Sequence, residues 1–254
     1  MRTVVLQREQ IQTGSLILVN ARHPYREGAA KQALRPVDPK APEVLLEEHA
    51  AAALSRLMDT LNGWEQITAV SGWRSIGEQQ EIYAQSLQEN GRAFTEKFVA
   101  LPGHSEHQTG LAIDLALTRE HIDFIRPDFP HSGIGQVFRQ HMASYGFVER
   151  YPHGKEAVTG IAQEPWHFRY VGTPHAVIME RNGFVLEEYL SFLKHYPYGK
   201  RWYSYRAGPA SAAISYLEAN KSGNTLLTLD DCVSCAISGS NLDGYIVTMG
   251  RDER

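Results

Sequence analysis

The sequence predicts a protein of the α+β class, with helices and strands mixed along one chain. Apolar residues between Val44 and Leu61 recur at helical spacing. Residues 110–117 and 166–170 alternate instead with the two-residue period of a strand. The two periods together are typical of a mixed protein, although they do not determine how its strands are arranged.

Four further elements are expected in the first part of the chain. They are a buried strand at 16–20, a proline-rich loop at 21–43, a strand at 67–70 and a helix at 76–90. Ser75 is a suitable N-cap for that helix, because its hydroxyl can accept a hydrogen bond from a free backbone N–H group. Gly91 is expected to end the helix.

The rest of the chain is expected to form two more helices and a β-rich tail. The helices are expected at 133–145, with Gly146 as the stop, and at 174–196. Beyond the second helix, short strands alternate with Gly, Ser and Asn turns. We therefore predict a main domain over 1–196 and a small β-rich C-terminal appendage of unknown role over 197–254.

The composition is that of an ordinary globular protein. Of 254 residues, 43% are hydrophobic and 21% are charged, and the net charge is −4. This balance gives no reason to expect nucleic acid or an anionic membrane as a partner. No run approaches the roughly 20 apolar residues of a transmembrane helix, and residues 1–10 lack the apolar block of a signal peptide. We expect a cytoplasmic protein without a membrane anchor, and its oligomeric state stays open.

The two cysteines, Cys232 and Cys235, form a C-x-x-C pair whose role the sequence leaves open. A structural zinc site requires two further ligands at matching spacing, which the sequence lacks. A redox role favours a strand–turn–helix setting, whereas this region is rich in Ser and Gly. Two reduced thiols are the simpler interpretation.

A first block of candidate site residues surrounds His107 and Asp114. These residues are seven positions apart, which would place them on opposite faces of one straight strand. They converge only if His107 lies in a turn before the strand, with Gly110 allowing the bend. An ionised Asp114 on so apolar a strand is costly unless it is paired or binds a metal.

A second block contains Glu164 and His167. Two His and one carboxylate are a common set of zinc ligands, which leaves a fourth position for water or substrate. His107, Asp114 and His167 are therefore candidate ligands of one Zn²⁺ per chain. Glu164, three residues before His167 and fixed before a proline, can accept the proton of a zinc-activated water and later return it to a leaving amine.

These residues also have ordinary interpretations. A single His is more often a hydrogen-bonded surface or core residue than a ligand, and the chain has 11. Asp114 can also serve as an N-cap or a salt-bridge partner. His104 flanks the first block and can line a site. The remaining histidines are treated as ordinary residues: His23, His49, His121, His131, His141, His153, His175 and His195.

Three blocks follow one another along the chain. They are Ser71-Gly72-Trp73-Arg74-Ser75 with Gln79, then Ser105-x-His107-x-x-Gly110-x-Ala112-x-Asp114, and finally Glu164-x-Trp166-His167. Together and in this order, they resemble the blocks of the LAS group of zinc D,D-peptidases. Three ordered blocks are far more specific than any one alone. The resemblance extends over about residues 10–196. Within 98–172 the chain is most similar to vancomycin-resistance D,D-dipeptidase/D,D-carboxypeptidases of the VanXY type.

The resemblance implies the same zinc ligands and the same base, and it adds a fold and three residues. The implied fold is a central antiparallel sheet that carries the ligands and is flanked by helices. Arg74 would polarise the scissile carbonyl and stabilise the oxyanion, with a structural salt bridge as its alternative role. Ser105 and Gln79 would bind the substrate. Their alternative roles are capping and a place on a solvated helix face.

The resemblance also implies an activity and small peptide substrates. Such enzymes hydrolyse the D-Ala-D-Ala dipeptide, the terminal D-Ala of peptidoglycan precursor pentapeptides, or both, and thereby cause glycopeptide (vancomycin) resistance. The preference between dipeptide and pentapeptide, and the acceptance of D-Ser or D-Lac termini, cannot be inferred from the residues.

Two alternative functions stay open. One is a peptidoglycan endopeptidase that cuts L-Ala-D-Glu bonds or cross-links. Such enzymes often carry a basic wall-binding module, whereas residues 197–254 contain six Lys and Arg against six Asp and Glu. The other is a zinc-containing binding module without catalysis, which would need to keep neither Glu164 nor Arg74.

Overall fold

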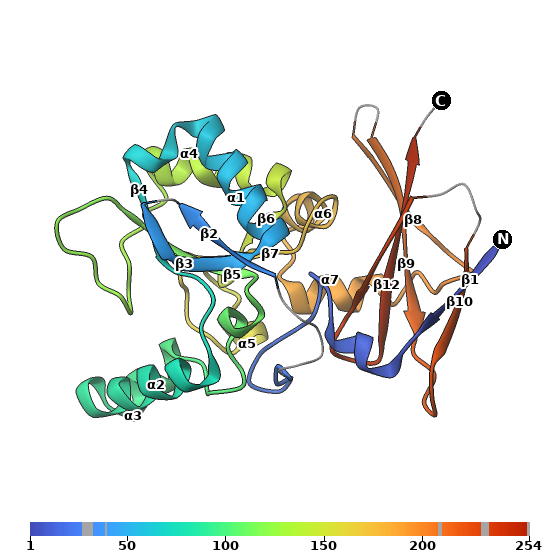
Figure 1. Ribbon diagram of the computed structural model, residues 1–254, viewed down its shortest axis with the longest axis horizontal. Helices are drawn as coiled ribbons and strands as arrows, with labels where there is room; N and C mark the ends of the chain where they lie inside the picture. The colour runs from blue at the N-terminus through green and yellow to red at the C-terminus, as the bar shows by residue number, and fades with distance from the viewer. Residues whose placement is uncertain (27–32, 39, 208–209, 230–233, 253–254) are drawn as a thin grey trace. The chain divides into compact units, whose positions relative to one another are not determined.

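The computed structural model describes residues 1–26, 33–38, 40–207, 210–229 and 234–252 (Figure 1). The chain folds into two compact units. The larger unit consists of residues 19–25 and the described residues from 33 to 185, and the smaller unit consists of residues 1–18, Arg26 and the described residues from 186 to 252. All candidate site residues lie in the larger unit.

A four-stranded antiparallel sheet forms the centre of the larger unit, in the order β4-β5-β7-β6. Its strands are β4 (Ile67–Ser71), β5 (Ala112–Leu117), β6 (Phe147–Glu149) and β7 (His167–Tyr170). Asp114 of β5 lies directly opposite His167 of β7 in the register of the sheet. The expected antiparallel sheet that carries the candidate ligands is therefore confirmed.

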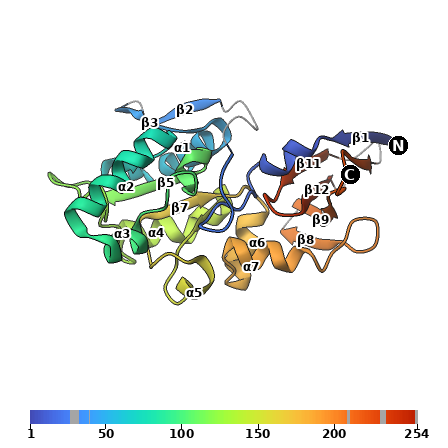
Figure 2. The ribbon, with the colours of Figure 1, turned by 90° about the horizontal axis from the view of Figure 1, so that it is seen from below.

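Helices flank this sheet, as expected. They are α1 (Glu48–Leu61), α2 (Ile76–Asn90), α3 (Arg92–Phe98), α4 (Gly133–Met142), α5 (Glu156–Thr159) and α6 (His175–Asn182). Figure 1 shows α1 and α4 together on one side of the sheet, and α2 and α3 lie side by side in Figures 1 and 2. The Phe138 ring of α4 lies 4.8 Å from the Phe168 ring of β7 between centroids, and both side chains are fully buried. Burial of a Phe side chain stabilises the fold by about 1.5–3 kcal/mol.

Local signals placed the ends of two helices correctly. Ser75 caps α2, because its hydroxyl accepts a hydrogen bond from the backbone N–H of Glu78 at 3.2 Å. The Glu78 carboxylate in turn accepts one from the Ser75 N–H at 2.7 Å, which completes a capping box. Gly91 ends α2, and Gly146 follows α4 and one further 3₁₀ turn, as predicted.

Two elements predicted in the first part of the chain are wrong in whole or in part. Residues 16–20 are not a strand, although residues 16–19 are buried. Part of the predicted loop at 21–43 forms a hairpin of β2 (Leu34–Asp38) and β3 (Ala41–Glu47), while residues 27–32 and 39 lie outside the described residues. The prolines of this hairpin are tolerated because it has two strands only and its register shifts between Pro36 and Asp38.

The other errors concern helix bounds. The helix expected from residue 44 begins at Glu48, because residues 44–47 belong to β3. The helix expected at 174–196 is two helices, α6 and α7 (Leu186–Leu193). Gly183 ends α6 with φ of +63°, a left-handed conformation that an unbroken helix does not contain.

The smaller unit is rich in β-structure, as expected for the C-terminal part of the chain. Its strands are β1 (Arg2–Leu6), β8 (Tyr203–Ala207), β9 (Ala210–Glu218), β10 (Thr225–Leu229), β11 (Ser234–Gly239) and β12 (Gly244–Asp252). β1 pairs with β10, and β11-β12-β9-β8 form a second antiparallel sheet. Buried residues of β1, β10 and β12 share one core: Leu6, Leu227, Leu229, Tyr245 and Val247. The domain boundary after residue 196 stays a prediction.

The structure describes one of the two cysteines and allows a search for membrane-spanning helices. Cys235 lies in β11 as a free, partly buried cysteine, and Cys232 lies outside the described residues. No helix within the described ranges combines the length and apolar character needed to cross a membrane.

Candidate active site

The position of His107 depends on a bend in the backbone before β5. His107 lies in a short 3₁₀ helix, Glu106–Thr109, which ends at Gly110 with φ of +67°. Glycine adopts this left-handed conformation without strain, so the predicted bend is confirmed. The Nδ1–H of His107 donates to the carbonyl oxygen of Gly72 at 2.7 Å. In the neutral ring that bond leaves Nε2 as the nitrogen that can bind a metal.

Nε2 of His107, the carboxylate of Asp114 and Nδ1 of His167 converge on one point. Nε2 of His107 lies 3.2 Å from Oδ2 of Asp114, and Nδ1 of His167 lies 3.0 Å from Oδ1. The ligand atoms of the triad all lie within 4.8 Å of one another. Ligands held about 2.0–2.1 Å from a tetrahedral zinc ion are themselves about 3.3 Å apart. The structure therefore brings the predicted ligands within reach of one metal ion.

The pKa values of the three ligand residues show which of them a cation finds deprotonated. Burial raises the pKa of Asp114, but the two imidazoles outweigh burial and hold that pKa below its usual range. Burial lowers the pKa of His167, whereas hydrogen bonds to Asp114 and Glu106 raise it, to a net value of about 9. Burial, together with the charge of Arg74, lowers the pKa of His107 to about 4. A cation that binds near pH 7 therefore needs to displace a proton from one of the two histidines.

Glu164 lies beside this cluster, in the turn that leads into β7. Its Oε2 is 3.8 Å from Nδ1 of His167. The backbone N–H of Glu164 donates to the carbonyl oxygen of Tyr151 at 3.0 Å, and its own carbonyl accepts from the His167 N–H at 3.2 Å. Burial raises the pKa of the carboxyl to about 8, although His167 and Arg74 oppose this rise. A pKa near neutrality suits a group that both accepts and returns a proton.

Arg74 lies just after β4 and also contacts Asp114. Its Nη2 donates to Oδ2 of Asp114 at 3.3 Å, and its Nη1 donates to Oε1 of Gln79 at 3.2 Å. Within the described residues, Nε of Arg74 is buried without a hydrogen-bond partner. A guanidinium group held in this way presents fixed donors to an oxygen that becomes negative during a reaction.

Gln79 and Ser105 line the same pocket, but in different ways. Gln79 is 1% exposed, so its alternative as a solvated residue is wrong. Its Nε2 donates to the carbonyl oxygen of Ala100 at 2.8 Å while its Oε1 accepts from Arg74, so this amide orients Arg74. Ser105 is also buried at the N-cap position of the 3₁₀ helix, but within the described part of the chain its hydroxyl makes neither a capping bond nor another hydrogen bond. That hydroxyl is free to bind a substrate.

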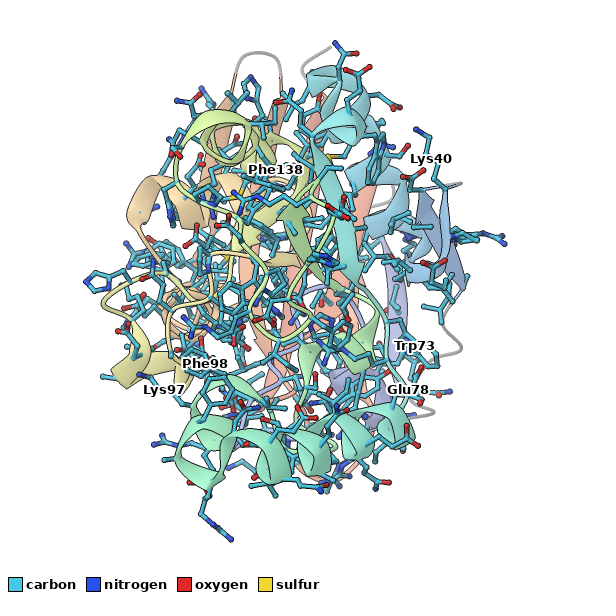
Figure 3. The ribbon with its side chains drawn as sticks, turned by 90° about the vertical axis from the view of Figure 1, so that its left-hand side faces the viewer. Lys40, Trp73, Glu78, Lys97, Phe98 and Phe138 are labelled. Carbon is cyan, nitrogen blue, oxygen red and sulfur yellow. The ribbon has the colours of Figure 1, made fainter. Side chains whose placement is uncertain are left out.

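Polar and apolar side chains line the pocket together. Its ionisable residues include the ligand triad, Glu164 and Arg74. Phe98, which ends α3 and is labelled in Figure 3, contributes to the walls. The other large apolar wall residues are Ile82, Val99, Phe124, Ile125, Tyr151, Ile161 and Trp166. Apolar side chains beside the ionisable residues exclude water and strengthen the electrostatic interactions among them.

Sequence reasoning missed a buried group of charges behind His167. Oε1 of Glu106 accepts hydrogen bonds from Nε of Arg150 at 2.8 Å and from Nη1 of Arg169 at 2.7 Å. All three side chains have no exposed surface. The two-residue period of β7 places Arg169 on the same side as His167, and this was the available signal for a buried anion nearby.

Comparison with known proteins identifies the family of the chain. The model of the VanY family, described as D-alanyl-D-alanine carboxypeptidase, matches residues 43–173. The chain is 42% identical over 180 residues to a bifunctional D-Ala-D-Ala dipeptidase and D-Ala-D-Ala carboxypeptidase of Enterococcus gallinarum, VanXYC, covering 70% of this chain and 95% of that protein.

Two solved structures are similar as well. The vancomycin-resistance D,D-dipeptidase VanXYg, in complex with a D-Ala-D-Ala phosphinate analogue, is 47% identical with a TM-score of 0.95 over 98% of this chain and 99% of that chain. A mutant of the D,D-pentapeptidase VanY from a VanB-type resistance cassette, in complex with Zn(II), is 30% identical with a TM-score of 0.56 over 69% of this chain and 98% of that chain. The first match covers both units of this chain, whereas the second covers about two thirds of it.

Proposed function

Because the chain belongs to the VanY family of D-alanyl-D-alanine carboxypeptidases, we propose that it is a zinc-dependent D,D-peptidase with both dipeptidase and carboxypeptidase activity. Its substrates are D-Ala-D-Ala and the terminal D-Ala of peptidoglycan precursor pentapeptides. The proposal rests on the triad of His107, Asp114 and His167, with the buried carboxylate of Glu164 at 3.8 Å from Nδ1 of His167. The similarity to VanXYC, which is named a bifunctional dipeptidase and carboxypeptidase, supports the assignment of both activities.

We assign the metal to the triad and the proton transfers to Glu164. Nε2 of His107, the carboxylate of Asp114 and Nδ1 of His167 would hold Zn²⁺, which would act as a Lewis acid and lower the pKa of water. Glu164 accepts a proton from the water that attacks the scissile carbonyl carbon. It then donates that proton to the leaving nitrogen as the C–N bond breaks, so that D-alanine leaves as an amine.

Arg74 stabilises the negative charge that develops on the carbonyl oxygen. Gln79 holds the guanidinium group in place, and the free hydroxyl of Ser105 binds the peptide. Both assignments rest on the contacts of Gln79 with Arg74 and Ala100 and on the position of Ser105 in the pocket wall.

The biological consequence is glycopeptide resistance. Removal of D-Ala-D-Ala, and of the terminal D-Ala from precursors that already contain it, favours precursors with another terminal residue. We propose that the protein acts in the cytoplasm, because free D-Ala-D-Ala and the precursor pentapeptide are made there. Fractionation of the producing cells tests this location, and activity found only outside the cytoplasm would contradict it.

Release of D-alanine from two substrates tests the function. Zinc-loaded protein is incubated with D-Ala-D-Ala and with the UDP-linked muramyl pentapeptide in parallel. Release from both is expected, and zinc removal by a chelator is expected to abolish it. Release from neither substrate by protein that contains zinc would contradict the proposal and favour an endopeptidase or a binding module.

A further inference from the structure

A second cavity, of about 240 Å³, adjoins the pocket of the candidate active site. The two share the wall residues Val99, Ala100, Tyr151 and Ile161. Neither the zinc ligands nor Glu164 line the second cavity. A cavity that opens beside the reacting atoms without containing them is positioned to bind a part of the substrate that does not react.

The charge of this cavity points to the chemistry of its ligand. Among the described residues that line it, Glu96 of α3 alone carries a formal charge at neutral pH when His104 is neutral. The Nδ1–H of His104 donates to the carbonyl oxygen of Asn20 at 2.8 Å, so Nε2 of the neutral ring is an acceptor. A carboxylate and an imidazole acceptor together favour a cationic hydrogen-bond donor.

Glu96 is available for such a ligand. Its Oε1 lies 3.2 Å from Nη1 of Arg92, one turn away on the same helix. Both side chains are exposed, at 53% for Glu96 and 80% for Arg92. Exposed ion pairs of this kind contribute little stability, so a ligand cation can replace Arg92 at little cost.

We propose that this second cavity binds the side chain of the residue that precedes D-Ala-D-Ala in a longer substrate, and that Glu96 selects a side chain ending in a primary ammonium group. The inference rests on the proposed function, because it takes the scissile bond to lie in the adjoining pocket. The free dipeptide has no residue at that position. The second cavity therefore contributes to the cleavage of longer peptides and not to that of D-Ala-D-Ala.

Three substrates separate the contribution of Glu96 from the peptidase activity that does not depend on the second cavity. They are Nα-acetyl-L-Lys-D-Ala-D-Ala, the same peptide with its lysine Nε acetylated, and D-Ala-D-Ala. Glu96→Gln is expected to lower kcat/KM for the ammonium peptide by about three- to fivefold, as for one exposed charge pair. It should leave kcat/KM for the other two substrates unchanged. Arg92→Gln, the matched control, removes the ion pair but keeps the carboxylate, so the ammonium peptide should be cleaved at least as well as by the wild type.

A second variant tests the cavity itself. Ala21 lines it from an exposed turn, so Ala21→Trp fills space without disturbing the core. This variant is expected to lower kcat/KM by about tenfold for both tripeptides and by less than twofold for the dipeptide. Equal effects on all three substrates, or no effect of either variant on the ammonium peptide, would overturn the inference while leaving the proposed function intact. A wild-type protein that cleaves none of the three would instead overturn the proposed function and this inference with it.

Discussion

Nε2 of His167 lies 3.5 Å from Oε2 of Glu106, while Nδ1 of the same ring faces Asp114 at 3.0 Å. The ring is therefore held between two carboxylates, one in the ligand triad and one behind it. Within the described residues, neither Nε2 of His167 nor Oε2 of Glu106 has another hydrogen-bond partner. A proton on Nε2 directed at Glu106 leaves the Nδ1 lone pair for a metal, which is how outer carboxylates orient histidine ligands.

Glu106→Gln is expected to weaken zinc binding by about 10- to 100-fold, because the outer partner of a ligand histidine is lost. A competition assay with a chromophoric chelator measures the zinc affinity. Glu149→Gln is the matched control, because Glu149 is a carboxylate with only 10% of its side chain exposed that also pairs with an arginine, Arg139, but contacts none of the zinc ligands. It should lower thermal stability without changing zinc affinity. Unchanged zinc affinity in a folded Glu106→Gln protein would refute the role of Glu106.

Zinc affinity should rise with pH between about 6.5 and 9. Without metal the pKa of His167 is about 9, so zinc must displace its proton, whereas His107 with a pKa of about 4 is already neutral. Calorimetric titrations at pH 7 in buffers of different ionisation enthalpy should therefore show release of at least one proton per zinc. Glu164, with a pKa of about 8, adds to that release where the cation lowers its pKa. Zinc binding without proton release would contradict the assigned protonation of His167.

The same pKa shifts predict how stability depends on pH. The raised pKa of His167 stabilises the metal-free protein below pH 6.5, and this contribution is lost as pH rises through about 9. The raised pKa of Glu164 stabilises it below about 4.5, and this contribution is lost as pH rises through about 8. Over this range zinc binds more tightly. The difference in Tm between zinc-loaded and metal-free protein should therefore widen from pH 6.5 to 9, and a constant difference would contradict both shifts.

The site could be predicted as far as its residues lie in local patterns. Gly110 signals the bend that brings His107 to Asp114, and the alternation of β7 places His167 on one face. The alternation of β7 also places Arg169 on the same face as His167, but no local pattern identifies Glu106 as the anion, because Arg150 and Arg169 are 44 and 63 residues away from it. Arrangements that depend on which distant residues meet in the core are a property of the tertiary fold.

Arg74→Lys is expected to lower kcat by about 10²–10³-fold with zinc content unchanged, since a lysine cannot present the same fixed donors to the oxyanion. Gln79→Ala should have a smaller effect in the same direction, because Arg74 would lose one of its two partners. Kinetics with D-Ala-D-Ala measure both. If Arg74 is only a structural salt-bridge partner, Arg74→Lys will change the Tm and leave kcat as in the wild type.

Arg139 is expected to position Glu164 through the backbone. Its Nη2 donates to the carbonyl oxygen of Pro165, the residue after Glu164, and its Nε donates to Glu149 at 2.7 Å. Arg139→Lys loses most of these bonds, so a small shift of Glu164 should lower kcat by about 10- to 100-fold with little change in KM. Glu149→Gln keeps the contact with Pro165 and should affect kcat far less. Equal kcat values for the two variants would argue against positioning by Arg139.

The fold was predictable where capping and periodicity act within one element, as for Ser75 and Gly91 at the ends of α2. The β2–β3 hairpin was missed because its prolines are typical of loops, and two-stranded hairpins tolerate them. The pairing of β1 with β10 was also missed. It joins strands more than 200 residues apart, and no local pattern in either strand identifies its partner.

The most direct test of the account is the turnover of Glu164→Gln, measured on D-Ala-D-Ala together with its zinc content. Glutamine keeps the size of the side chain but cannot accept the proton of the attacking water. We predict that the Glu164→Gln variant binds one zinc per chain and has a kcat lower by about 10²–10⁴-fold than that of the wild type. Wild-type turnover by the zinc-loaded variant would contradict the assignment of Glu164 as the base, and with it the mechanism proposed for this site.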